Sequence, residues 1–200
     1  MQDLKWENVC DKIREYKAMA KITWAGQSCF QISVSNGKDH SADIIIDPLK
    51  EEKADILLLA KEDNKVKTTK GESFIVNGPG EYEVKGVFIQ GIPSSQNTIY
   101  VFEAEELRFC HLGDLGQKEL TDEQLEKIDS VDVLMISVVD EAPKIIGQIE
   151  PKIVIPMEYD NVAKFLKTMG KASVVPQDKF IVKQSVLPKE GATEIVVLQP

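Results

Sequence analysis

The spacing of apolar residues changes near the middle of this chain, and this change most limits the folds that the sequence can adopt. In the first half, roughly residues 20–112, short segments rich in β-branched and aromatic residues follow one another, separated by Gly, Pro, Asn or charged turns. From Thr121 onward, helical and strand-like patterns alternate. A β-rich half followed by an α/β half predicts two sheets covered by helices.

The expected elements can be placed along the chain from these patterns. The first half predicts strands at residues 21–25, 29–35, 42–47, 54–60, 66–69, 73–76, 84–90, 98–103 and 107–112. The second half predicts helices ending at residue 128 and spanning 142–149 and 161–169, with strands at 131–139, 152–155, 172–175, 179–184 and 193–198. Thr121 and Gln124 form a capping box that opens the first of these helices. Asn36-Gly37 is typical of a tight hairpin turn.

The N-terminal segment has a different pattern from the strands that follow it. Apolar residues recur there at three- and four-residue intervals between charged residues, and these are Trp6, Val9, Cys10, Ile13 and Tyr16. We expect an amphipathic helix docked on the main core, the alternative being a helix that recruits a partner. The chain therefore divides into an N-terminal amphipathic helix, residues 1–19, and a single domain, residues 20–200.

Composition excludes several classes of partner and location. The net charge of −9 disfavours nucleic acid and anionic membrane surfaces, because binding to phosphate depends on a basic surface. The three cysteines are widely separated and form no C-x-x-C pair, so neither a disulfide framework nor a cysteine zinc site is indicated. No apolar segment approaches the ~20 residues of a membrane helix, and no secretory leader is indicated. We expect a cytoplasmic protein.

Only two histidines are available for metal or acid–base chemistry, so no two-histidine metal motif at short spacing can be written. His40 lies in a polar stretch typical of a solvated loop. His111 ends a strand before the glycine-bounded turn that carries Asp114, and loops at a sheet edge are where sites are often built. Alternatively, Asp114 hydrogen-bonds turn amides and His111 packs locally. Taken by themselves, these residues favour this structural interpretation.

An ordered series of motifs resembles the metallo-β-lactamase superfamily. The motifs are residues 22–30 (Ile-Thr-Trp-Ala-Gly-Gln-Ser-Cys-Phe), Ile46-Asp47-Pro48, 54–59 (Ala-Asp-Ile-Leu-Leu-Leu), 78–84 (Gly-Pro-Gly-Glu-Tyr-Glu-Val), 97–100 (Asn-Thr-Ile-Tyr), 111–114 (His-Leu-Gly-Asp) and 155–159 (Ile-Pro-Met-Glu-Tyr). The later motifs are similar to a branch of uncharacterised hydrolases related to ascorbate-phosphate lactonase. The resemblance implies an α/β (α+β) fold, a four-layer αββα sandwich of mixed sheets with helices on the outer faces.

The same resemblance indicates that the metal site is degenerate. Active members carry a His-x-His-x-Asp-His loop after the strand matched by residues 54–59, and here its ligand positions hold Lys61, Asp63, Lys65 and Val66. The lysine ammonium has no lone pair to give a metal; if Lys61 and Lys65 point inward, they can replace the charge of the metal. Asp114 matches the bridging aspartate of the family. Glu158 stands where a histidine is expected, and Gln27 replaces the histidine of the Gly-His-Ser opening.

Three hypotheses follow from this pattern. The first is a non-catalytic protein of this fold, a pseudoenzyme without a cofactor, which binds a small molecule or a protein partner. The alternative is a metal-dependent hydrolase of an ester, lactone or phosphoester. It would bind Mn²⁺, Mg²⁺ or Ca²⁺ through Asp63, Asp114 and Glu158, with His111 or Glu81 as proton carrier. The third, which rests on the N-terminal helix, is a homo-oligomer or an assembly subunit beside an active paralogue.

Overall fold

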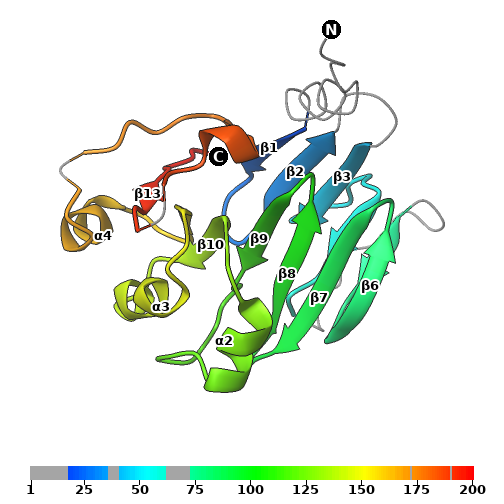
Figure 1. Cartoon of the computed structure of the whole chain (residues 1–200), viewed down its shortest axis with the longest axis horizontal. Coiled ribbons are helices and arrows are strands. Elements are labelled where there is room, and N and C mark those ends of the chain that lie inside the picture. The colour runs from blue at the N-terminus through cyan, green and yellow to red at the C-terminus, as the bar shows by residue number, and fades with distance from the viewer. Residues whose placement is uncertain (1–17, 36–40, 62–72, 172, 190) are drawn as a thin grey trace, which may run out of the picture.

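Two mixed β-sheets lie face to face in the structure, a computed structural model that describes residues 18–35, 41–61, 73–171, 173–189 and 191–200 (Figure 1). One sheet has the order β12 (Phe180–Val182), β1 (Met19–Trp24), β2 (Phe30–Ser35), β3 (Ser41–Ile46), β4 (Ile56–Leu58) and β5 (Phe74–Val76). The other has the order β13 (Glu194–Ile195), β11 (Ile153–Met157), β10 (Val133–Ser137), β9 (Leu107–His111), β8 (Thr98–Ala104), β7 (Val87–Pro93) and β6 (Gly80–Val84).

Strand direction follows from the connections. Hairpins join β1 to β2, β6 to β7, β7 to β8 and β8 to β9, so these neighbours are antiparallel. The strands β9, β10, β11 and β13 are parallel, because α2 (Asp122–Ile128), α3 (Ala142–Ile149) and the segment containing α4 (Ala163–Thr168) connect them. The strand β4 is parallel to β3 and to β5. The carboxyl ends of β3 and β4 therefore lie at one edge of the first sheet, and those of β9, β10 and β11 at one edge of the second.

The main core lies between the two sheets. Alternate side chains of the six-stranded sheet, such as Ile22, Phe30 and Ile44, pack against Tyr100 and Phe102 of the facing sheet. A second apolar cluster lies on the outer face of the seven-stranded sheet, beneath the described α-helices (Figure 1). Because β10 and β11 are buried on both faces, they read in the sequence as continuous apolar runs.

The expected fold is confirmed, and most local predictions agree with it. The helix at 142–149 has the predicted bounds, and the Thr121 capping box is present. The strand predicted at 84–90 is confirmed from Val87 onward, and its predicted start is wrong, because Lys85 and Gly86 adopt positive φ and make the turn between β6 and β7. Residues 173–175 form no strand. The N-terminal helix, the turn at residues 36–37 and the strand at 66–69 lie outside the described residues. Within the described ranges, no helix has the length and apolar character to cross a membrane.

Candidate functional site

An ion pair joins the two sheets at the carboxyl ends of their strands. Lys61 lies three residues after β4, and Asp114 lies three residues after β9. The Nζ atom of Lys61 is 3.1 Å from Oδ2 of Asp114 and donates a hydrogen bond to it. The two side chains are 50% and 48% exposed, so this pair is reachable from solvent. It brings together the residue predicted at the first ligand position of the metal loop and the aspartate predicted to match the family's bridging aspartate.

Three carboxylates act on the ammonium of Lys61. The pKa of Lys61 is raised above its ordinary value, mainly by the hydrogen bond to Asp114 and against a smaller opposing effect of partial burial. The negative charges of Asp114, Glu158 and Asp47 raise it further, in that order. Lys61 is therefore protonated at neutral pH and is the cationic centre of an acidic group.

Asp47 holds the backbone that leads to Lys61. It follows β3, is buried, and adopts a left-handed backbone with φ of 45°. Its Oδ1 accepts a hydrogen bond from the Ala60 amide at 2.7 Å, and its own amide donates to the Leu58 carbonyl at 2.9 Å. The Ala60 carbonyl in turn accepts from the amide of Thr98 at 2.8 Å. One carboxylate thus fixes the end of β4 to which Lys61 is attached.

Glu158 and Ser137 connect the ends of β11 and β10 to the turn carrying Asp114. The buried hydroxyl of Ser137 donates to Oε2 of Glu158 at 2.6 Å, and the same Oγ lies 3.0 Å from the Gly113 carbonyl oxygen. Glu158 has a left-handed backbone, with φ of 55°. The contacts with Ser137 therefore orient Glu158 beside the Asp114 turn.

Three of the eight non-glycine residues with positive φ among the described residues lie at this edge. Such residues elsewhere serve hairpin turns or helix ends, and they are Lys85, Glu105, Glu106, Asp129 and Glu150. The remaining three lie on the site side of the sheets, Gln27 in the hairpin between β1 and β2, and Asp47 and Glu158 directly after β3 and β11. Each such residue costs roughly 1 kcal/mol or more, and strained backbone tends to persist at functional positions. Two of these positions, Gln27 and Glu158, are ones where the family resemblance predicts a histidine in active members.

The turn that carries Asp114 is fixed by its neighbour, residues 94–97. The Asn97 side-chain amide donates to the Leu112 carbonyl at 2.7 Å, and the Ser95 hydroxyl donates to the Leu115 carbonyl at 3.0 Å. Gly113 has φ of 59°, and a Cβ at this position would lie 2.1 Å from Nδ2 of Asn97. Only glycine fits both the angle and the space, so the approach of these loops determines where Asp114 points.

His111 lies beneath the site as a neutral, fully buried ring. Its Nε2–H donates to the Ser28 carbonyl at 3.0 Å, since a carbonyl can only accept, and the ring packs edge-to-face on Phe30. Its Nδ1 has no hydrogen-bond partner among the described residues. Burial lowers the pKa of His111, and the opposing effects of Asp47, the Ser28 carbonyl and Glu158 do not reverse this shift.

The lowered pKa of His111 predicts a loss of stability in mild acid. Below about pH 6.5 the unfolded chain binds a proton at this residue that the folded chain excludes, so the free energy of unfolding should fall by up to ~1.4 kcal/mol per pH unit. Above pH 6.5 His111 is neutral in both the folded and the unfolded chain, so its contribution to the free energy of unfolding no longer changes with pH. Urea unfolding between pH 7.5 and 5.3 should show a shallower decline for His111→Gln than for the wild type. The matched control is His40→Gln, and equal slopes for all three proteins would contradict the prediction.

The structure brings together only some of the candidate site residues. Asp114 contacts Lys61, and Glu158 is held beside the Asp114 turn by Ser137, while Asp63, Lys65, Val66 and His40 lie outside the described residues. Glu81 lies on the edge strand β6. This strand is the third from β9 in the sheet, so the backbones of the two strands are about 14 Å apart. Asp47 and Ser137 belong to the site, although the sequence did not single them out as site residues. For Asp47, the sequence signal that could have indicated this role is its place at the end of a strand, directly before Pro48.

The described residues do not fit a metal centre of the family type. They include no group of three or more His, Cys, Asp or Glu side chains placed to hold a metal ion. A dinuclear centre requires several lone-pair donors around each ion. Here one oxygen of Asp114 accepts from Lys61 and one oxygen of Glu158 accepts from Ser137.

Comparison with known proteins places the chain in a family. Residues 21–158 match the model of the beta-lactamase superfamily domain. A protein from Thermotoga maritima described as a Zn-dependent hydrolase of the metallo-β-lactamase superfamily is 30% identical, with a TM-score of 0.72, and the match covers 90% of this chain and 98% of that one. This chain therefore belongs to the metallo-β-lactamase superfamily.

More distant structures share the fold alone. The diiron β-hydroxylase CmlA from Streptomyces venezuelae is 10% identical, with a TM-score of 0.54 over 84% of this chain and 54% of that chain. The metallo-β-lactamase-fold protein YhfI from Bacillus subtilis is 8% identical, with a TM-score of 0.52 over 90% and 96% of the two chains. Among proteins of curated function, none matches this chain.

Proposed function

We propose that this protein is a non-catalytic member of the superfamily, which uses the degenerate site as a scaffold for binding a ligand or a partner. The observation that carries the proposal is the 3.1 Å ion pair between Lys61 and Asp114. Lys61 stands at the position matched to the first histidine of the metal loop. Its ammonium donates a hydrogen bond to a carboxylate oxygen of Asp114, the aspartate matched to the family's metal ligand. The ammonium of Lys61 thus supplies beside Asp114 the positive charge that a metal ion would supply in relatives.

The charge of Lys61 opposes metal binding directly. At an effective dielectric near 20, an ammonium ~4 Å from a divalent ion is repelled by roughly 8 kcal/mol before further solvent screening. This repulsion is comparable with the whole binding free energy of a micromolar site, about 8 kcal/mol. A divalent ion at Asp114 would therefore have to displace the ammonium and break its hydrogen bond.

The alternative is a metal-dependent hydrolase of an ester, lactone or phosphoester with a rebuilt carboxylate site. One observation favours it, since Ser137 Oγ lies 2.6 Å from Oε2 of Glu158 and 3.0 Å from the carbonyl oxygen of Gly113, the residue before Asp114. These contacts place Glu158 beside the Asp114 turn. Asp63 would have to supply the third carboxylate. Mn²⁺, Mg²⁺ or Ca²⁺ would suit such oxygen ligands.

Metal content and metal-dependent stability distinguish these functions. We expect protein purified without chelator to contain far less than one metal ion per chain, whether wild type, Asp114→Ala or the exposed control Glu83→Ala. We also expect Mn²⁺ and Mg²⁺ to leave its melting temperature unchanged, whereas a bound ion at 100 times its Kd would stabilise the protein by ~2.7 kcal/mol. Stoichiometric metal that is lost in Asp114→Ala and kept in Glu83→Ala would overturn the proposal and support the hydrolase.

A further inference from the structure

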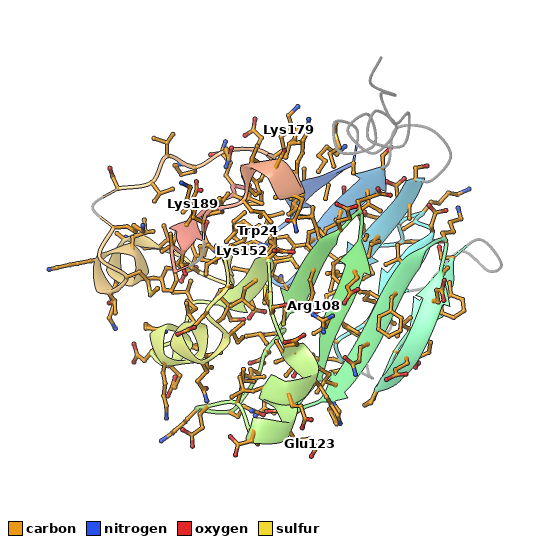
Figure 2. The ribbon with its side chains drawn as sticks, viewed as in Figure 1. Trp24, Arg108, Glu123, Lys152, Lys179 and Lys189 are labelled. Atoms are coloured by element: carbon orange, nitrogen blue, oxygen red, sulfur yellow. The ribbon has the colours of Figure 1, made fainter. Side chains whose placement is uncertain are left out.

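A basic and apolar surface lies on the edge of the six-stranded sheet, far along the chain from the ion pair. The strand β12 is an edge strand, and its Val182 faces the core between the sheets, whereas Ile181 points outward and is 46% exposed. Lys179 and Lys183 flank the strand at the alternate positions that share the face of Ile181. Lys179 projects from this corner of the molecule, beside the 3-10 helix η1 (Gln184–Val186) (Figure 2).

The neighbouring strand adds a third lysine to this surface. Lys21 of β1 is exposed and pairs in register with Ile181, while Ala20 and Ile22 on either side of it are buried. We call Lys21, Lys179, Ile181 and Lys183 the β12 face. Its lysines take part in no ion pair among the described residues. A chain of net charge −9 therefore presents three lysines around an exposed isoleucine, with Asp178 and Asp43 as the nearby carboxylates.

The chain itself contains a segment of complementary chemistry, residues 1–17, just before β1. If this segment is helical, Trp6, Cys10 and Ile13 form an apolar stripe. Acidic residues recur every fourth position along one side of it, and they are Asp3, Glu7, Asp11 and Glu15, with Arg14 among them. Lys5 and Lys12 would lie on the other side of the apolar stripe. A helix of 17 residues is about 25 Å long, enough to cross several strands spaced ~4.8 Å apart.

The connectivity also brings this segment to the β12 face. Residue 18 leads directly into Met19 of β1, the strand beside β12. The α-helices among the described residues all pack on the seven-stranded sheet, so within those residues no helix covers this face. We propose that residues 1–17 dock in cis as an amphipathic helix on the β12 face, with the apolar stripe on Ile181 and acidic side chains toward the three lysines. This inference does not depend on the proposed function.

Reactivity of Cys10 tests the proposal in the full chain. Cys29 and Cys110 are free and fully buried, and burial raises the pKa of the Cys29 thiol to about 11 and that of Cys110 as well, so both react slowly. A thiol reagent therefore reports on Cys10 in the native protein. We expect Cys10 to react at least tenfold more slowly in the wild type than in a synthetic peptide of residues 1–17.

Substitutions on the β12 face should remove this protection. Ile181→Asp, and separately Lys179→Glu with Lys183→Glu, should bring the rate at Cys10 close to that of the peptide. Val139→Asp, at a 50% exposed valine elsewhere, and Lys118→Glu are matched controls that should leave the rate unchanged. Slow labelling of Cys29 and Cys110 in each variant verifies that it is folded.

Three outcomes would overturn the proposal. The first is wild-type Cys10 that reacts at the rate of the peptide. The second is protection that survives both β12-face variants, which would place the segment elsewhere. The third is protection that disappears on dilution together with a change in molecular size, because the segment would then dock on a second copy.

Discussion

Gly113→Ala is expected to lower the free energy of unfolding by about 3 kcal/mol, through ~1–2 kcal/mol for a left-handed alanine and ~1–3 kcal/mol for overpacking. The φ of Gly113 is 59°, and the new Cβ would lie 2.1 Å from Nδ2 of Asn97 and 3.3 Å from Cβ of Ala60. Asn97 cannot move away freely, because its amide donates to the Leu112 carbonyl. Urea unfolding followed by tryptophan fluorescence measures the change.

Gly147→Ala is the matched control for this substitution. Gly147 lies inside α3, and a Cβ there meets nothing within 4 Å. Alanine is the better helix former, so this variant should gain ~0.5–1 kcal/mol of stability. Effects of the same sign and size in the two variants would contradict the account of the Asp114 turn. A neutral Gly113→Ala would show that the loop can relax and that Asp114 is not rigidly oriented.

Asp47→Ala should cost about 3 kcal/mol, because it leaves the buried amide of Ala60 without its charged acceptor and places alanine in a left-handed conformation. Asn keeps an oxygen acceptor and tolerates positive φ, so Asp47→Asn should cost only about 1 kcal/mol. The difference separates the hydrogen bond to Ala60, 2.7 Å long, from the rest of the side chain. Guanidinium unfolding of both variants provides the measurement.

Asp43→Ala controls for the loss of a carboxylate from the same strand. Asp43 is exposed on β3, and its substitution should change stability by no more than about 0.5 kcal/mol. Equal losses for Asp47→Ala and Asp47→Asn would mean that the charge, and not the hydrogen bond, carries the contribution. A loss for Asp43→Ala as large as that for Asp47→Ala would contradict the special role of the β3 end.

Local signals in the sequence were sufficient where the deciding contacts are themselves local. The capping box of α2 joins residues three positions apart, and α3 is defined by the spacing of its own apolar residues. The turn at Lys85-Gly86 was missed because lysine rarely adopts positive φ, and pairing between β6 and β7 imposes it there. Sheet pairing, rather than local preference, decided that boundary.

The site was only partly predictable because its contacts connect distant parts of the chain. Asp114 and Glu158 were found through family motifs, whereas Ser137 meets Glu158 across 21 positions and has no motif of its own. Asp47 looked like a strand end before proline, and its hydrogen bond to Ala60 depends on the parallel pairing of β3 with β4. The roles of Ser137 and Asp47 could not be predicted from the sequence, because strand pairing brings their hydrogen-bond partners next to them.

The sequence by itself determined the superfamily fold, because apolar spacing, turn residues and ordered motifs are read along the chain. Through the family resemblance it also predicted that the metal-binding histidines are replaced. It did not determine what Lys61 does. That was decided by the tertiary structure, in which the end of β4 in one sheet faces the turn after β9 in the other and brings two residues 53 positions apart into an ion pair. Coulomb attraction acts over a few ångströms of space, so only the packing of the two sheets could establish that contact.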